Sequence, residues 1–127
     1  MAVPNPYQQY RQQQVNTASQ EKLLLMLFDG AIRFCRIAVK AIEEKQEEMA
    51  HTNLIKAQDI IEELISSLNF DYEIAQRLYS LYDYLYIRLV EANMNKDAAI
   101  IDEALRFLTE LRETWAEAAV KAREGMV

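Results

Sequence analysis

Apolar residues recur at helical spacing over four long segments of the chain, residues 17–48, 51–68, 71–93 and 97 onward. Only two Gly and two Pro occur, and both Pro lie within the first six residues, so nothing in the sequence breaks these segments. The links between them have the short lengths that join antiparallel neighbours. The pattern predicts an all-α protein, an antiparallel up-down four-helix bundle.

The ends of the first two helices are predicted from capping signals. Residues Thr17 to Gln20 have the form of a capping box, with a hydroxyl at the N-cap and a Gln three residues later. The first helix is expected to run from there to about Glu48. The second is expected to begin near His51 or Thr52 and to end around Leu68.

The last two helices have acidic capping candidates. Asp71 is expected to cap a third helix that runs to about Asn93, and Asp97 to cap the fourth. At 100° per residue, the inner faces of the four helices hold mostly aliphatic side chains. They are Leu24, Phe28, Ala31, Ile32, Cys35, Ala38, Val39 and Ile42; Leu54, Ala57, Ile60, Ile61, Leu64 and Leu68; Leu78, Leu81, Tyr82, Leu85 and Leu89; and Ile101, Ala104, Leu105, Leu108, Leu111, Trp115 and Ala119.

Gly30 lies inside the first predicted helix, where it costs about 1 kcal/mol relative to Ala. One interpretation is that a neighbouring helix packs closely against it. The other is a tolerated weak position, and the sequence leaves both open.

The third helix carries more apolar surface than one core face needs. Residues 78–90, LYSLYDYLYIRLV, contain ten aliphatic or aromatic side chains among thirteen. A second stripe beside the core face consists of Tyr79, Tyr86 and Val90, with Ile87 at its edge. The first helix has similar positions, predicted to lie off its core face: Leu23, Leu27, Phe34 and Ile37. These residues either contact a second neighbouring helix within the bundle or form a groove for a helix of another protein.

The N-terminal residues 1–16 form a predicted cap segment, a short helical piece before the bundle of residues 17–127. Asn5 and Pro6 have the form of an N-cap followed by a proline at N1, and Tyr7 and Tyr10 stand three apart on one helical face. A helix this short is not stable alone, so it either docks over an apolar groove or remains a frayed terminus.

Composition excludes several classes of partner. At 127 residues the chain is expected to form one domain, and its net charge of -6 provides no basic field for nucleic acid or a membrane surface. The single Cys35 cannot form an internal disulfide and is expected to fill the core. The N-terminus has no signal-peptide pattern, so a cytoplasmic location is expected.

His51 is the residue on which a different function would rest. Glu48 and His51 have the Glu-x-x-His spacing of di-iron bundles, and an exposed helical His also serves phosphotransfer bundles. Di-iron sites need two such motifs, and this chain has one His, placed at a predicted helix junction. A His-dependent phosphotransfer or metal-binding bundle is the alternative function, and a solvated loop His is the simpler interpretation. No Gly-rich phosphate loop is present, and no cofactor or metal is expected.

Four segments follow one another along the chain: NPYQQYRQQQVNTASQEKLLLMLFDGAIRF, NLIKAQDIIEEL, LYDYLYIRLVEAN and LTELRETW. In this order, over nearly the whole chain, they resemble the FliS family of flagellin-specific flagellar secretion chaperones. The resemblance implies a non-enzymatic helical bundle that holds the disordered C-terminal segment of flagellin, prevents its premature polymerisation and assists its export by flagellar type III secretion. It also implies contact with export-gate components, and it leaves room for a homodimer of the free protein.

The resemblance also places the N-terminal segment over part of the flagellin site, which falls on Tyr7 and Tyr10 here. Together with the apolar positions outside the predicted core faces, these tyrosines make up the predicted partner-binding set. Its members are Tyr7, Tyr10, Leu23, Leu27, Phe34, Tyr79, Tyr86, Ile87 and Val90.

Overall fold

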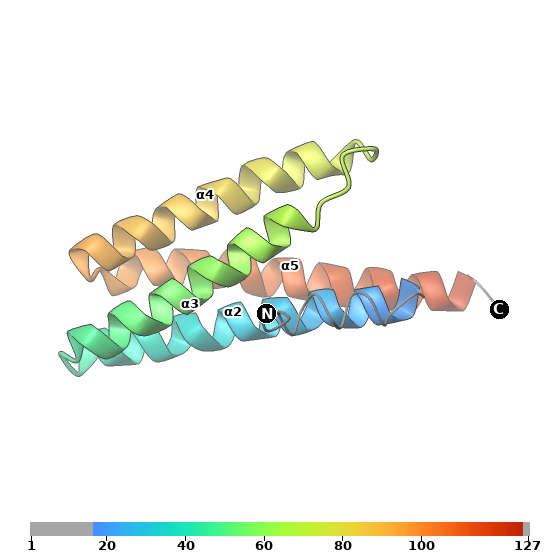
Figure 1. Cartoon of the computed structure of the whole chain (residues 1–127). Helices are drawn as coiled ribbons and strands as arrows, with labels where there is room; N and C mark the ends of the chain where they lie inside the picture. The colour runs from blue at the N-terminus through green and yellow to red at the C-terminus, as the bar shows by residue number, and fades with distance from the viewer. Residues whose placement is uncertain (1–16, 126–127) are drawn as a thin grey trace, which may run out of the picture.

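The computed structural model describes residues 17–125, which form four α-helices and no strand (Figure 1). The helices are α2 (Thr17–Glu43), α3 (Glu47–Ser66), α4 (Ile74–Asn95) and α5 (Ala98–Gly125). The all-α prediction is confirmed. The predicted cap segment, residues 1–16, lies outside the described residues.

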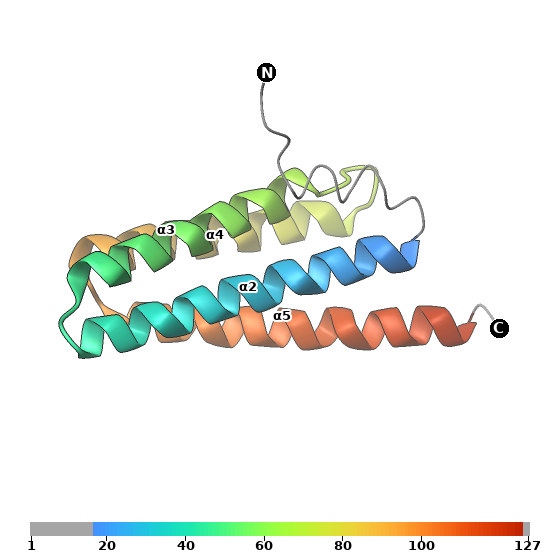
Figure 2. The same cartoon turned by 60° about the horizontal axis from the view of Figure 1, so that its bottom comes forward.

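The helices run alternately up and down, and each packs against two others. α2 lies against α3 and α5, and α4 lies against α3 and α5, so the four helices close a ring. Figure 1 and Figure 2 both show α4 diverging from α5 toward the end where the link between α3 and α4 lies. α4 and α5 therefore lie closer together at one end of the bundle than at the other.

One apolar core runs through the middle of the bundle. Phe28 of α2 and Tyr82 of α4 contact each other across it, with ring centroids 6.4 Å apart. Leu54, Ile61 and Leu64 of α3 are fully buried beside them. Every residue predicted for an inner face is buried in this core or packed against it, so the helical-periodicity prediction is confirmed.

The boundary between α2 and α3 differs from the prediction. α2 ends at Glu43 and α3 begins at Glu47, so the junction precedes His51 by several residues. Lys45 adopts a left-handed conformation with φ of 60°, and the Gln46 amide donates to the Ala41 carbonyl at 2.8 Å. This turn satisfies the carbonyls at the end of α2 as a C-terminal capping motif does.

The two acidic capping predictions have opposite outcomes. Asp71 does not cap α4, because its own amide donates to Asn69 Oδ1 at 3.0 Å and the helix begins three residues later. Asp97 does cap α5, since its carboxylate accepts a hydrogen bond from the Ala99 amide at 3.0 Å. Before it, Lys96 takes a left-handed conformation that ends α4.

Candidate functional site

The second stripe of α4 is only partly covered by the bundle. Tyr79 is 40% exposed and Ile87 is 55% exposed, whereas Tyr86 and Val90 are half-buried. Phe70, from the link before α4, lies against Tyr79 with ring centroids 6.1 Å apart. Large apolar side chains therefore remain on the surface along one side of α4.

Tyr86 is the member of the stripe that a neighbouring helix holds. Its pKa is raised chiefly by a hydrogen bond with the Glu62 side chain of α3, which a hydrogen bond with Gln58 partly opposes. Tyr86 therefore fits the interpretation that the second stripe contacts a second neighbouring helix within the bundle. Tyr79 and Ile87 do not fit it, because their surfaces stay open to solvent.

The apolar residues of α2 that were predicted to lie off its core face are mostly covered by the bundle. Leu23 and Leu27 are buried, with 8% and 3% of their surface exposed, so the prediction that they lie off the core face is wrong. The same side of α2 packs on α3, where Phe34 lies 5.4 Å from the Lys56 ammonium. Phe34 is half-buried, and Ile37 is exposed at the rim of this contact.

An apolar cavity of about 260 Å³ opens at the divergent end of the bundle. All four helices or their ends contribute to it, with Leu24 from α2, Leu78 from α4 and Trp115 from α5. The full lining is Leu24, Ser67, Leu68, Asn69, Tyr72, Ile74, Ala75, Leu78, Tyr82 and Trp115. Tyr79 lies at the same end of α4 as this cavity, and Ile87 lies further along the helix. We treat the cavity and these two exposed side chains as one candidate site.

Tyr82 and Trp115 form the floor of the cavity. Burial raises the pKa of Tyr82 to about 12, while a hydrogen bond with the Trp115 side chain acts in the opposite direction. The phenol is protonated at neutral pH, as a tyrosine with an ordinary pKa also is, and it supplies a hydroxyl, not a charge. The floor is suited to apolar side chains of a ligand.

Sequence reasoning missed three large apolar residues at this end of the bundle, Phe70 and Tyr72 of the link and Ile74 at the start of α4; Tyr72 and Ile74 line the cavity. Phe70, Tyr72 and Ile74 are all more than half exposed, although they are among the largest apolar side chains of the protein. Their spacing of two, which does not fit a helical period, is the signal that would have marked them. Large exposed apolar groups of this kind mark interaction surfaces.

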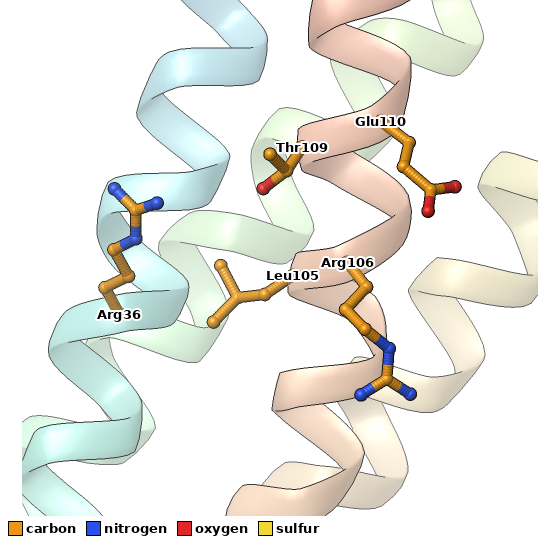
Figure 3. Close-up of a pocket in the computed structure, with 5 residues that line it drawn as sticks. All are labelled: Arg36, Leu105, Arg106, Thr109 and Glu110. Atoms are coloured by element: carbon orange, nitrogen blue, oxygen red, sulfur yellow. The ribbon is translucent and has the colours of Figure 1, made fainter.

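A second cavity, of about 330 Å³, lies between α2 and α5. Figure 3 shows Leu105 and Thr109 of α5 pointing toward α2, whereas Arg36 extends along α2 and Arg106 and Glu110 extend toward the other side of α5. These polar groups do not converge on one point, so the cavity lacks the close nucleophile and base that catalysis needs.

His51 and Cys35 provide no chemistry in this structure. His51 lies within α3, not in a loop as predicted, and its exposed Nδ1 is 2.9 Å from the Asn93 amide nitrogen. Between residues 17 and 125, no group of three or more His, Cys, Asp or Glu side chains could hold a metal ion. Cys35 is fully buried in the core as predicted, and burial raises the pKa of its thiol to about 12.

Tyr7 and Tyr10 lie outside the described residues. Within the described helices, none combines the length and the apolar character that a membrane span requires.

Comparison with known proteins gives one consistent family. The profile of the family described as "Flagellar protein FliS" matches residues 3–122. A flagellar secretion chaperone FliS of Bacillus subtilis is 42% identical over 124 residues, which is 98% of this chain and 93% of the relative. Proteins of the same description from Salmonella typhimurium and Escherichia coli are 36% and 32% identical, covering 85% and 81% of this chain and 82% and 78% of theirs. With a match over almost its whole length and this bundle, the chain belongs to the FliS family.

Proposed function

We propose that this protein is a cytoplasmic flagellar secretion chaperone that binds the disordered C-terminal segment of flagellin. It keeps flagellin from polymerising before export and assists its delivery to the flagellar type III secretion system. The observation that carries the proposal is the 42% identity, over 98% of the chain, to a relative named as a flagellar secretion chaperone.

The candidate site supports binding of a helical client. Leu24, Leu78 and Trp115 line the cavity at the divergent end, where they can contact apolar side chains of the client. Tyr79 and Ile87 add exposed apolar surface along α4. An amphipathic helix that docks in such a groove buries its apolar face at about 25 cal/mol per Å² of apolar area. The binding free energy is smaller than this gain, because a disordered client must be ordered.

A pull-down with the C-terminal segment of the host's flagellin tests the proposal. The immobilised segment is expected to retain this protein, whereas an N-terminal segment of the same flagellin is the matched control and is expected to retain much less. Equal capture by both segments, or capture by neither, would overturn the proposal. Replacing His51 by Ala tests the alternative function, since a chaperone is expected to tolerate the change fully.

Two further contacts are part of the same proposal. Delivery to the secretion apparatus requires contact with its export-gate components, and the apolar surface of the free protein would also allow a homodimer. A dimer that uses this surface is expected to dissociate when the flagellin segment binds. Sedimentation of the free and loaded protein distinguishes these states by mass.

A further inference from the structure

The charges of the bundle are distributed unevenly between its helices. Residues 47–73, which span α3 and the link to α4, contain seven carboxylates and Lys56 as the single cation. Lys56 lies over the Phe34 ring of α2, on the side of α3 that faces away from α4. In α4, Arg88 is paired with Glu103 of α5. Arg77, nine residues before Tyr86, lies on the opposite side of the helix at 100° per residue. The surface where α3 meets α4 is therefore acidic.

Several of these carboxylates gather around one aromatic side chain. The neighbouring Glu62 side chain is the main cause that raises the pKa of the Tyr86 hydroxyl, and the charge of Asp59 also raises it. Asp83 lies on the same side of α4, between Tyr79 and Tyr86 in the sequence. No ion pair joins Asp59, Glu62 or Asp83 to a cation within residues 17–125.

Gln58 adds an independent feature at this position. Its side chain is 7% exposed, and its Oε1 is buried without a hydrogen-bond partner in the described structure. The side chain of Gln58 lies near the Tyr86 hydroxyl, and it acts to lower the pKa of that hydroxyl. A buried acceptor without a donor destabilises the free protein, so a ligand donor that reaches it would relieve a cost already present.

We infer that Gln58, Asp59, Glu62, Asp83 and Tyr86, here called the acceptor seam, bind an arginine side chain of the client helix. This inference rests on the proposed function and names the chemistry that the client must bring. The seam presents oxygen acceptors beside an aromatic ring, which is what a guanidinium with five donors and a planar face requires. Gln58 Oε1 is buried in the free protein, so a client donor reaches it only after side chains of the seam rearrange.

Titration calorimetry with a synthetic C-terminal flagellin segment tests the inference, at about 50 mM and about 500 mM salt. The seam variant carries Asp59→Asn and Glu62→Gln. Its matched control carries Asp102→Asn and Glu117→Gln, two exposed carboxylates of α5, so both variants lose the same charge. The seam variant is expected to bind about tenfold more weakly at low salt and to lose most of the salt dependence, with the control within about twofold of the wild type.

Replacing Gln58 separates a binding role from a structural one. Gln58→Met removes the acceptor with little change in side-chain length, so the unfolding temperature is expected to stay equal or rise while client affinity falls. Client segments in which each Arg or Lys is replaced by Gln identify the docked residue. If the docked residue contacts the seam, its replacement in the client is expected to weaken binding to the wild type but not to the seam variant, as in a double-mutant cycle.

The outcomes distinguish the two proposals. If the wild type binds no segment, the proposed function fails, and the inference fails with it. If the wild type binds but the seam variant binds equally well, or the control weakens as much as the seam variant, only the acceptor seam is overturned.

Discussion

Gly30 of α2 lies directly against Ile60 of α3, and a Cβ built on Gly30 would be 3.0 Å from Cδ1 of Ile60. This distance favours the close-packing interpretation of Gly30 over the tolerated weak position. The contact lies on the side of α2 that also buries Leu27. It shows why the first two helices can approach closely at this point.

The first prediction is a double-mutant cycle at this contact. Gly30→Ala alone is expected to gain little or to destabilise, because the gain in helix propensity of about 1 kcal/mol is offset by the contact with Ile60. In an Ile60→Val background the obstructing methyl is absent, so the same change is expected to stabilise by about 1 kcal/mol. Urea unfolding of the four proteins measures this. Full stabilisation by Gly30→Ala in the wild-type background would show that the contact imposes no constraint.

The second prediction separates client contacts from core contacts on α4. Tyr79→Asp and Ile87→Asp are expected to weaken flagellin binding and to change the free energy of unfolding by about 0.5 kcal/mol or less, because both side chains are exposed. Leu85→Asp buries a charge in the core and is expected to cost about 4 kcal/mol or more.

Val120→Asp is the control for these changes, since Val120 is similarly exposed but lies on α5. It is expected to leave flagellin binding unchanged. If Tyr79→Asp and Ile87→Asp destabilise the protein as strongly as Leu85→Asp, the whole second stripe belongs to the core. Tyr86→Asp is expected to give a mixed result, weaker binding with a moderate loss of stability, because Tyr86 is half-buried.

The third prediction concerns alkaline pH. Burial raises the pKa of Cys35 from 9.0 and that of Tyr82 from 10.0, each to about 12. Above pH 9 the unfolded chain releases protons that the folded protein keeps, so stability falls with rising pH, and these two groups add no pH dependence well below that point. The slope is expected to approach about 1.4 kcal/mol per pH unit for each group.

Urea unfolding between about pH 8 and about pH 11 measures this slope. Tyr82→Phe retains the ring and is expected to remove the share of the slope that begins near pH 10. A free energy of unfolding that does not change up to pH 11 would contradict the assigned burial of both groups.

The fourth prediction concerns the cap segment. If residues 1–16 compete with flagellin for the apolar surface, Tyr7→Ala with Tyr10→Ala is expected to leave client binding equal or tighter, because apparent affinity falls with the fraction of capped protein. The free variant is also expected to bind more apolar dye or to self-associate. Titration of the double variant and of a form that starts at Val15 measures the effect. Weaker binding by both would show direct contact of the tyrosines with the client.

The four helices were predictable because periodicity alone fixes which side chains share a face. Their ends were less predictable. The residues around Lys45 are Glu, Lys and Gln, all good helix formers, and the left-handed turn there has no Gly to mark it. Asp71 looked like an N-cap, but Asn69 takes its amide into a local turn instead.

The candidate site was predictable only in part. Periodicity gives the direction of each side chain around a helix, but it does not tell how much of the helix surface its neighbours bury. α2 contacts both α3 and α5, so it buries Leu23 and Leu27 as well as the narrow predicted face. Tyr79 and Ile87 remain exposed whereas Tyr86 and Val90 of the same stripe are half-buried, a difference that the sequence pattern does not predict. The contribution of Tyr72 and Ile74 depends on the path of a link, which no periodic pattern encodes.

Calorimetry of flagellin binding at several temperatures, combined with circular dichroism of the mixture, tests the central claim most directly. If the C-terminal flagellin segment folds as it binds an apolar surface, the heat-capacity change is expected to be clearly negative, on the order of -0.5 kcal/mol/K. The helix signal of the complex is expected to exceed the sum of the separate signals. A heat-capacity change near zero, with no added helicity, would contradict the claim that this bundle binds its client by folding it.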